Sequence, residues 1–340
     1  MPKTVAKNNN YDNLLSSLKS GEIGTFYIFH GEERYLLDYC LGQLRAKLCP
    51  DGLDGFNYKR YDSKNLSLDE LEEAINTLPA FAERTFIEVH DFDIFATNVR
   101  ERICKIVSDL PEYVCLLFVY NTVAYKPDGR IKLNKEIQKY ASIVEFVVQD
   151  QEKLVKWVKR HFADAGKKID TQEAEYISFI TGGLMSTLKG EIEKVAAFSK
   201  SDIIVRDDID AVVSPVLDAV TFKLTDAIVS GNFKLSTQIL GELFQMREAP
   251  HKMIYSISLK LRQLLTARVC IENGLGKTHF MEMCGIRHEF QARGLWATAN
   301  KSTLSSCKAS VIHCSEAALD LNSTTDPEAR IVELLLRLQK

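Results

Sequence analysis

The sequence predicts an α/β domain with a parallel sheet, followed by a small helical domain and a larger all-α domain. Over residues 1–149, strand-like apolar runs alternate with amphipathic helices, which indicates β–α crossovers within one parallel sheet. From about Gln151 onward the strand signal disappears. The chain holds only 17 glycines and eight prolines in 340 residues, which is typical of a helix-rich protein. The expected domains are residues 1–149, 150–213 and 214–340.

Five runs in the first domain have the composition of buried strands, because each is short and rich in β-branched and aromatic residues. The predicted strands are Thr25–Gly31 (TFYIFHG), Phe56–Asp62 (FNYKRYD), Thr85–Phe92 (TFIEVHDF), Cys115–Asn121 (CLLFVYN) and Ile143–Val148 (IVEFVV). Amphipathic helices are expected around and between them, with apolar residues at helical spacing. These helices carry the apolar positions Leu14–Leu18, Leu36–Leu44, Leu68–Leu78 and Ile103–Leu110. Ser67 and Glu70 form a capping box that opens the third of them.

The rest of the chain is predicted to be helical. The three helices expected in residues 150–213 carry the apolar positions Leu154–Phe162, Ile177–Ile180 and Leu188–Ala196, and the short segment IIVRDDIDAVV follows them. Gly182 and Gly183 close the second of these helices. Beyond Pro215 helices are expected to the end, and Asp326 with Pro327 marks the start of the last one, because aspartate is a good N-cap and proline fits the first helical position.

Composition excludes several classes of protein. A net charge of −3 argues against a uniform nucleic-acid-binding surface. The longest apolar run, Tyr113–Tyr120, is far shorter than the roughly 20 residues that cross a bilayer, and the N-terminus lacks the apolar segment of a secretory signal. None of the eight cysteines forms a CxxC pair. We therefore expect a cytoplasmic protein with reduced thiols, no membrane segment, no metal and no cofactor.

The residues after the first strand test for a nucleotide site. A phosphate-binding loop has the pattern GxxxxGK[ST], in which glycine-rich backbone is followed by a lysine and a hydroxyl. Here Gly31 is followed by Glu32 and Glu33, whose carboxylates would repel phosphate. Residues Gly31–Glu33 are therefore interpreted as a degenerate P-loop position that binds no nucleotide. The later GLGKT at Gly274–Thr278 follows a helix instead of a strand, so we interpret it as a helix end and a polar turn.

The remaining charged residues indicate no catalytic or metal-binding set. Glu88 and Asp91 lie at the end of the third strand, where an ATPase keeps its Mg²⁺-binding acids, and without a P-loop they are interpreted as solvated carboxylates. The densest basic cluster consists of Lys156, Lys159, Arg160, Lys167 and Lys168. A solvated helix face is the preferred explanation of that cluster, because runs of charge usually face water.

The most informative segment is LEEAINTLPAFAERTFIEV, residues 71–89. Its amphipathic helix is expected to run through Leu78, where Pro79 interrupts it, and Phe81 follows at a helix-to-strand corner. A bulky aromatic residue just after a proline is suited to present an apolar tip to a partner. The alternative, that Phe81 fills the domain's own core, stays open at this point, because most large aromatic side chains are buried.

Segments along nearly the whole chain, in order, resemble the delta subunits of bacterial DNA polymerase III. In the first domain they are FYIFHGEERYLLDYCLGQL, INTLPAFAERTFIEV, and LLFVYN with KPDGRIKLNKEI and VEF. In the second they are LVKWVKRHFADAGKKID and LKGEIEKVAAF, and in the third VTFKLTDAIVSGN, LKLRQLL and DPEARIVELLLRL. No single segment is as specific as a metal motif, but their order and spacing make the resemblance strong.

The resemblance implies an AAA+-type α/β domain without an active ATP site, a helical lid and an all-α collar that joins subunits. It implies a non-catalytic subunit of a DNA-directed DNA polymerase (nucleotidyltransferase) complex, which binds the sliding clamp (beta) and favours its open ring. Its other partners would be tau/gamma and delta-prime type loader subunits and primed DNA, through residues that the resemblance does not identify. The clamp-binding element would be Leu78, Pro79, Ala80 and Phe81, although relatives usually carry a second bulky apolar residue at the position of Ala80.

Two other functions remain as alternatives. One is an AAA+-like ATPase, against which the acidic pair Glu32–Glu33 argues and which an ATP-binding assay would distinguish. The other is a helical adaptor outside replication, which would keep the same architecture but have no affinity for a ring clamp or for loader ATPases.

Overall fold

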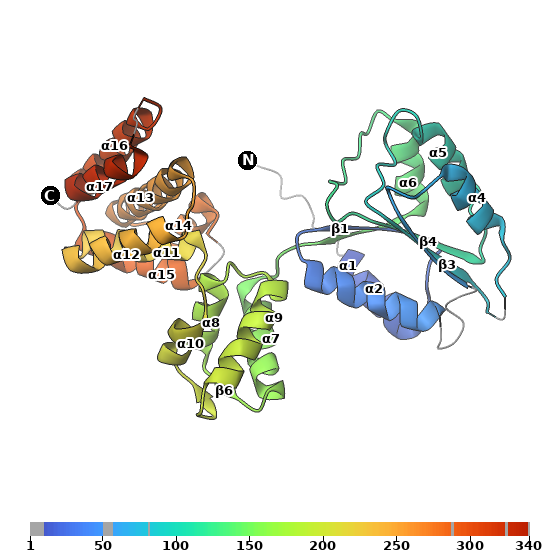
Figure 1. The fold of residues 1–340 in the computed structure, drawn as a ribbon, viewed down its shortest axis with the longest axis horizontal. Helices are drawn as coiled ribbons and strands as arrows, with labels where there is room; N and C mark the ends of the chain where they lie inside the picture. Colours follow the sequence, from blue (N-terminus) through green and yellow to red (C-terminus); the bar gives the residue numbers. More distant parts are fainter. Residues whose placement is uncertain (1–9, 50–56, 81, 287–288, 324–325, 339–340) are drawn as a thin grey trace. The chain divides into compact units, whose positions relative to one another are not determined.

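The computed structural model describes residues 10–49, 57–80, 82–286, 289–323 and 326–338. The chain divides into two compact units, Met1–Val148 and Gln149–Lys340, each of which is described by itself (Figure 1). A further division of the second unit at residues 213/214 remains a prediction.

The first unit alternates helices and strands along the chain. Its elements are α1 (Asn10–Ser20), β1 (Phe26–Gly31), α2 (Arg34–Leu48), β2 (Tyr58–Asp62), α4 (Leu68–Asn76), β3 (Thr85–His90), α5 (Arg100–Ser108), β4 (Val114–Val119), α6 (Lys132–Tyr140) and β5 (Ser142–Phe146). The five predicted strands are confirmed within a few residues, except that Phe56 of the second prediction lies outside the described residues.

The five strands form one parallel sheet in the order β2-β3-β4-β1-β5. Helices α4, α5 and α6 lie on one side of this sheet, and α1 and α2 lie on the other (Figure 1). Successive side chains of a strand point to opposite faces, so Ile28 packs in the core beneath α4–α6, whereas its neighbour Phe29 lies edge-on to Phe146 on the opposite face. Burial on both faces explains why β4 (VCLLFV) is continuously apolar and why β1 begins with the apolar run FYIF.

Two helices of this unit differ from the sequence prediction. The helix α4 begins with the predicted Ser67–Glu70 capping box but ends at Asn76, so Leu78 is not part of it. The reason is Pro79, because the residue before a proline is disfavoured in the helical conformation. The helix α6 was not predicted, since its nine residues offer few apolar positions, of which Leu133 and Ile137 are buried.

The second unit is almost entirely helical. Its elements are α7 (Gln151–Asp164), β6 (Lys168–Ile169), α8 (Thr171–Ile180), α9 (Met185–Phe198), β7 (Ile203–Ile204), α10 (Arg206–Val212), α11 (Leu217–Val229), α12 (Phe233–Gln245), α13 (Pro250–Glu272), α14 (Lys277–Cys284), α15 (Glu289–Lys301), α16 (Leu304–Asp320) and α17 (Pro327–Leu338). The expectation that strands end near Gln151 was wrong for β6 and β7, which pair in parallel but have only two residues each and leave no sequence pattern.

Local capping signals of the second unit are confirmed. The Asp326 carboxylate accepts a hydrogen bond from the Ala329 N–H at 3.0 Å, at the start of α17. After α8, Gly182 and Gly183 have φ values of 81° and 78°, a left-handed conformation that glycine adopts without strain.

An aromatic cluster connects α8, α10, α11 and α15 within this unit. The rings of Phe179, Phe222 and Phe290 lie 5.3–6.4 Å apart. The guanidinium of Arg206 lies 3.5 Å from the ring centroid of Tyr176 and forms an ion pair with Glu173. These contacts join the region predicted as a lid to the region predicted as a collar.

Two chemical features of the whole chain complete the fold. All eight cysteines are free thiols, and seven of them are buried. Across the described ranges, no helix is both long enough and apolar enough to span a membrane.

Candidate functional site

The corner between α4 and β3 presents a large apolar side chain to solvent. Leu78 is 72% exposed, whereas Pro79 and Ala80 are half-buried. The predicted anchor Phe81 lies outside the described residues. A leucine exposed to this degree contributes nothing to its own core, so it is available for contact with another protein.

The backbone of this corner is held by a buried side chain. The Asn57 amide group donates to the Ala80 carbonyl oxygen at 2.5 Å, and its oxygen accepts from the Ala80 N–H at 2.7 Å. At the helix end, the Thr77 N–H and hydroxyl both donate to the Glu73 carbonyl oxygen. The exposed Leu78 therefore lies between two hydrogen-bonded neighbours.

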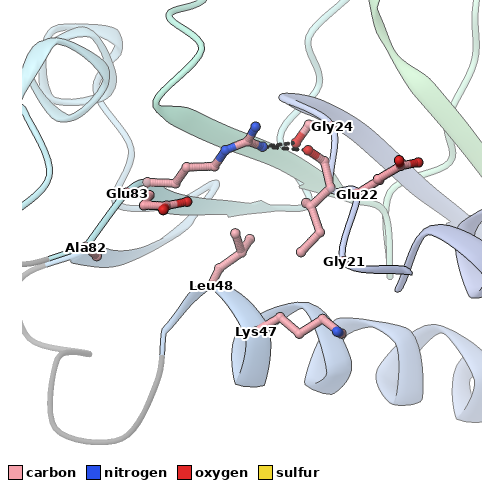
Figure 2. A pocket seen from close by; sticks show the side chains of 9 residues that line it. Gly21, Glu22, Gly24, Lys47, Leu48, Ala82 and Glu83 are labelled. Atoms are coloured by element: carbon pink, nitrogen blue, oxygen red, sulfur yellow. Dashed lines mark hydrogen bonds between the residues drawn. The ribbon is translucent and has the colours of Figure 1, made fainter. Parts of the chain in front are cut away.

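A pocket of about 800 Å³ lies beside the corner, near the N-terminal ends of strands β1 and β3 (Figure 2). It is lined by Gly21, Glu22, Ile23, Gly24, Lys47, Leu48, Ala82, Glu83 and Arg84. The Arg84 guanidinium crosses one wall and donates to the carbonyl oxygens of Ile23 and Gly24, drawn as dashed lines in Figure 2. This contact ties the start of β3 to the loop that precedes β1.

Residues Gly31–Glu33, interpreted from the sequence as a degenerate P-loop position, lie at the end of β1, where the strands finish. Gly31 has a φ of 129°, and a Cβ atom there would lie 2.2 Å from the Phe146 carbonyl oxygen. That same oxygen accepts the N–H of Glu33 at 2.9 Å, while the Glu33 side chain is fully buried and Glu32 is exposed. Tyr11 of α1 packs edge-on against Phe146. The turn between β1 and α2 is thus hydrogen-bonded to Phe146 of β5, against which Tyr11 of α1 packs.

Charged groups at this edge bind the protein's own backbone. Arg34 donates to the Tyr120 carbonyl oxygen at 2.8 Å, to the Asn121 side-chain oxygen at 2.5 Å and also to the Asn121 carbonyl oxygen. Asp91 accepts three backbone N–H groups, from Asn121, Thr122 and Val123. Partial burial raises the pKa of Asp91, but these hydrogen bonds lower it more, so its pKa is below the ordinary value.

Glu88 is not the solvated carboxylate that the sequence predicted. Its side chain is fully buried on the sheet face beneath α2, where Arg45 donates to both carboxylate oxygens at 2.5 and 2.6 Å. His90 lies 3.1 Å from the same carboxylate. Burial raises the pKa of Glu88, whereas the hydrogen bonds from Arg45 and His90 lower it, and the net effect is a lowered pKa.

Two family models match this chain. "DNA polymerase III, delta subunit" matches residues 27–147, and "DNA polymerase III delta subunit, C-terminal domain" matches residues 218–338. The chain belongs to the DNA polymerase III delta subunit family. Both matched segments fall in the regions where the sequence showed its resemblance.

Individual delta subunits agree with this assignment. The chain is 27% identical to DNA polymerase III subunit delta of Bacillus subtilis over 268 residues, 77% of each chain. It is 22% identical to the probable DNA polymerase III subunit delta of Aquifex aeolicus over 274 residues, 78% of this chain and 76% of the relative. The solved structure of the Bacillus subtilis DNA clamp loader delta protein has the same fold, with a TM-score of 0.54 at 22% identity over 97% of this chain and 99% of that one.

Sequence reasoning missed a basic pocket in this delta-family chain. The pocket has a volume of about 630 Å³ and lies where α5 and α6 begin. It is lined by Arg100, Glu101, Cys104, Lys105, Arg130, Ile131, Lys132 and Leu133. Neither helix has a side-chain cap at its N-terminus, although the Arg100 N–H donates to the Ala96 carbonyl oxygen and the Asn134 N–H to the Ile131 carbonyl oxygen. The two segments are too far apart in the sequence for any linear motif to reveal the pocket.

The basic cluster that the sequence did identify is largely paired within the second unit. Lys156 forms an ion pair with Glu152, and Lys159 donates to the Thr171 hydroxyl. Lys167 donates to the carbonyl oxygens of Ser199 and Ser201. These pairings, with Lys156 and Arg160 exposed on α7, are in keeping with the preferred explanation of a solvated helix face.

The GLGKT segment ends one helix and begins another. The N–H of Leu275 donates to the Cys270 carbonyl oxygen and that of Gly274 to the Ile271 carbonyl oxygen, which is the Schellman arrangement at the end of α13. Lys277 begins α14 and forms an ion pair with Glu289. Among the residues that the structure describes, no group of three or more His, Cys, Asp or Glu side chains could hold a metal ion.

The buried Glu88 predicts a pH dependence of stability. Because the folded-state pKa is lowered, the stabilisation by Arg45 and His90 is fully present above the ordinary pKa of 4.5 and is lost as pH falls through the folded value. We expect Glu88→Gln to flatten the loss of stability below about pH 4.5, measured by urea unfolding at several pH values. Glu328→Gln, on the exposed start of α17, is the control. An acid limb unchanged by Glu88→Gln would contradict this prediction.

Proposed function

We propose that this chain is the clamp-loader subunit that binds the sliding clamp and favours its open ring, without hydrolysing ATP. The observation that carries the proposal is the corner of a delta-family chain, where Leu78 is 72% exposed beside a backbone fixed by Asn57. The first unit provides the platform for this corner, and Phe81 follows it directly in the sequence.

The proposed mechanism is mechanical. Burial of one large apolar side chain contributes about 1.5–3 kcal/mol, which is too little for tight binding, so Leu78 and Phe81 must act together with surrounding contacts. To open a ring, the subunit must bind the open form more tightly than the closed form, because equal affinity for both shifts no equilibrium. A rigid corner suits this role, because a corner of fixed shape can fit the clamp surface of the open ring better than that of the closed ring.

The absence of ATP turnover is proposed from the edge of the sheet at Gly31–Glu33. A nucleotide-binding chain would direct backbone N–H groups and a lysine at the phosphates there. In this chain the N–H of Glu33 is bonded to Phe146, the Glu33 carboxylate is buried at the start of α2, and Arg34 is bonded to the end of β4. These contacts support a site that holds no triphosphate.

The other partners are proposed from family membership together with surface character. The C-terminal helices expose large apolar side chains, among them Ile312 and Leu319 of α16 and Leu336 of α17, which is consistent with contact to other loader subunits in a collar. Primed DNA is assigned to the basic pocket at the starts of α5 and α6, because lysine, arginine and uncapped helix N-termini attract phosphate. The complex would work in the cytoplasm.

Substitution at the corner tests clamp binding. We expect Leu78→Ala and Phe81→Ala each to weaken the affinity for the purified clamp by about tenfold or more, because each removes the burial of one large apolar side chain. Equilibrium binding with labelled clamp measures the effect. Leu319→Ala, an equally exposed leucine of α16, should bind as the wild type does. Wild-type affinity in both corner variants would refute the clamp-binding proposal.

Addition of ATP should leave the stability of the chain unchanged. A ligand at 100 times its Kd raises the free energy of unfolding by about 2.7 kcal/mol, so binding would be readily visible. We expect no shift of the urea unfolding midpoint with millimolar Mg²⁺–ATP. A saturable increase would instead support the ATPase alternative.

Charge removal in the basic pocket tests the assignment of DNA. In the assembled loader, Lys132→Ala should weaken binding of primed DNA and lower the slope of log K against log salt concentration by about one, as expected for the loss of one phosphate contact. Lys139→Ala removes an exposed charge from the same helix outside the pocket and serves as the matched control. Equal salt slopes for Lys132→Ala and the wild type would overturn the assignment.

A further inference from the structure

We propose that Asn57 is a positioning residue that holds the clamp-binding corner in its binding shape before the clamp arrives. This inference rests on the proposed function and adds a residue that does not itself contact the clamp. Asn57 is fully buried. Its side-chain nitrogen donates to the Ala80 carbonyl oxygen at 2.5 Å, and its side-chain oxygen accepts from the Ala80 N–H at 2.7 Å. Ala80 lies two residues from the exposed Leu78.

The geometry of this pair reproduces a backbone ladder. A carboxamide that bonds to both the N–H and the C=O of one residue holds it as a neighbouring strand would, and among the described residues the strand pairing of β2 with β3 begins only at Tyr58 and Phe86. Asn57 directly precedes β2, and Tyr58 of β2 is in register with Phe86 of β3. The corner is thereby attached to the edge of the same sheet from which β3 continues.

The neighbouring residues leave the corner little other freedom. Pro79 has a fixed φ and no N–H, so it contributes rigidity but no hydrogen bond. Thr77 is bonded back to Glu73 of α4, and Arg84 is bonded to Ile23 and Gly24 at the start of β3. Asn57 supplies the hydrogen bonds that the structure gives to Ala80 between those two anchors.

A simpler explanation is that Asn57 only satisfies its own buried amide. The two explanations predict different affinities for the clamp when Asn57 is replaced. If Asn57 positions the corner, its loss transfers the cost of ordering the backbone to the binding step, and affinity for the clamp falls even where the chain stays folded. If Asn57 is only structural, its loss lowers stability without a selective change in clamp affinity.

The experiment compares Asn57→Ala with Asn134→Ala, a buried asparagine of α6 away from the corner. Clamp affinity and urea unfolding are measured for both, with Leu78→Ala and the double variant Asn57→Ala/Leu78→Ala. We expect Asn57→Ala to bind the clamp about tenfold more weakly, while Asn134→Ala binds as the wild type does. In the double variant the two losses should be less than additive, because a loose corner no longer presents Leu78.

Hydrogen exchange of the wild-type chain provides a second measurement, which can still overturn the inference if Asn57→Ala does not fold. The Ala80 N–H should exchange slowly, because it is bonded to a buried side chain. Exchange at the rate of an unprotected amide, or wild-type clamp affinity in a folded Asn57→Ala, would overturn the inference. Failure of the proposed function is distinguishable, since Leu78→Ala and Phe81→Ala would then bind normally while the Ala80 N–H still exchanges slowly.

Discussion

The close contact between Gly31 and the backbone of Phe146 fixes the shape of the turn that follows β1. Strands β1 and β5 approach so closely there that even a Cβ atom would lie 2.2 Å from the Phe146 oxygen. The same oxygen accepts the Glu33 N–H, so the turn after β1 is bonded to its own sheet. In a nucleotide-binding fold this turn must remain open toward phosphate. Here the sheet keeps its layered architecture, and the turn after β1 is hydrogen-bonded to Phe146 of β5, which supports the proposal that it holds no nucleotide.

Other charged side chains of the first unit are also bonded to groups of the same chain. Arg34, Asp91 and Glu88 have the residue types that ATPases direct at phosphate and Mg²⁺, yet each is bonded to a backbone group or a side chain of this chain. These side chains are therefore bonded within the chain. The corner between α4 and β3, where we propose that the clamp binds, lies at the other end of the strands.

Local patterns in the sequence predicted the fold well, because strand composition, capping boxes and helix-ending glycines depend on neighbouring residues. The strands, the Ser67–Glu70 box and the Asp326 cap are of this kind. Glu88 was misjudged because its partner Arg45 lies 43 residues away and only the fold brings them together. Asn57 gave no signal for the same reason, since its partner Ala80 is 23 residues away. Leu78 was predicted to be a site residue, which stays a prediction, but its place beyond the end of α4 was not expected.

The strand order has a consequence for synthesis of the chain. The first strand to leave the ribosome, β1, lies in the sheet between β4 and β5, which are the last two strands of the unit to be made. The apolar FYIF segment of β1 therefore has no neighbouring strand to pair with until nearly the whole unit has emerged. At about 5–20 residues per second, this leaves a nascent strand with open edges for several seconds. The topology that places β1 between β4 and β5 therefore leaves its backbone N–H and C=O groups without a neighbouring strand until late in synthesis.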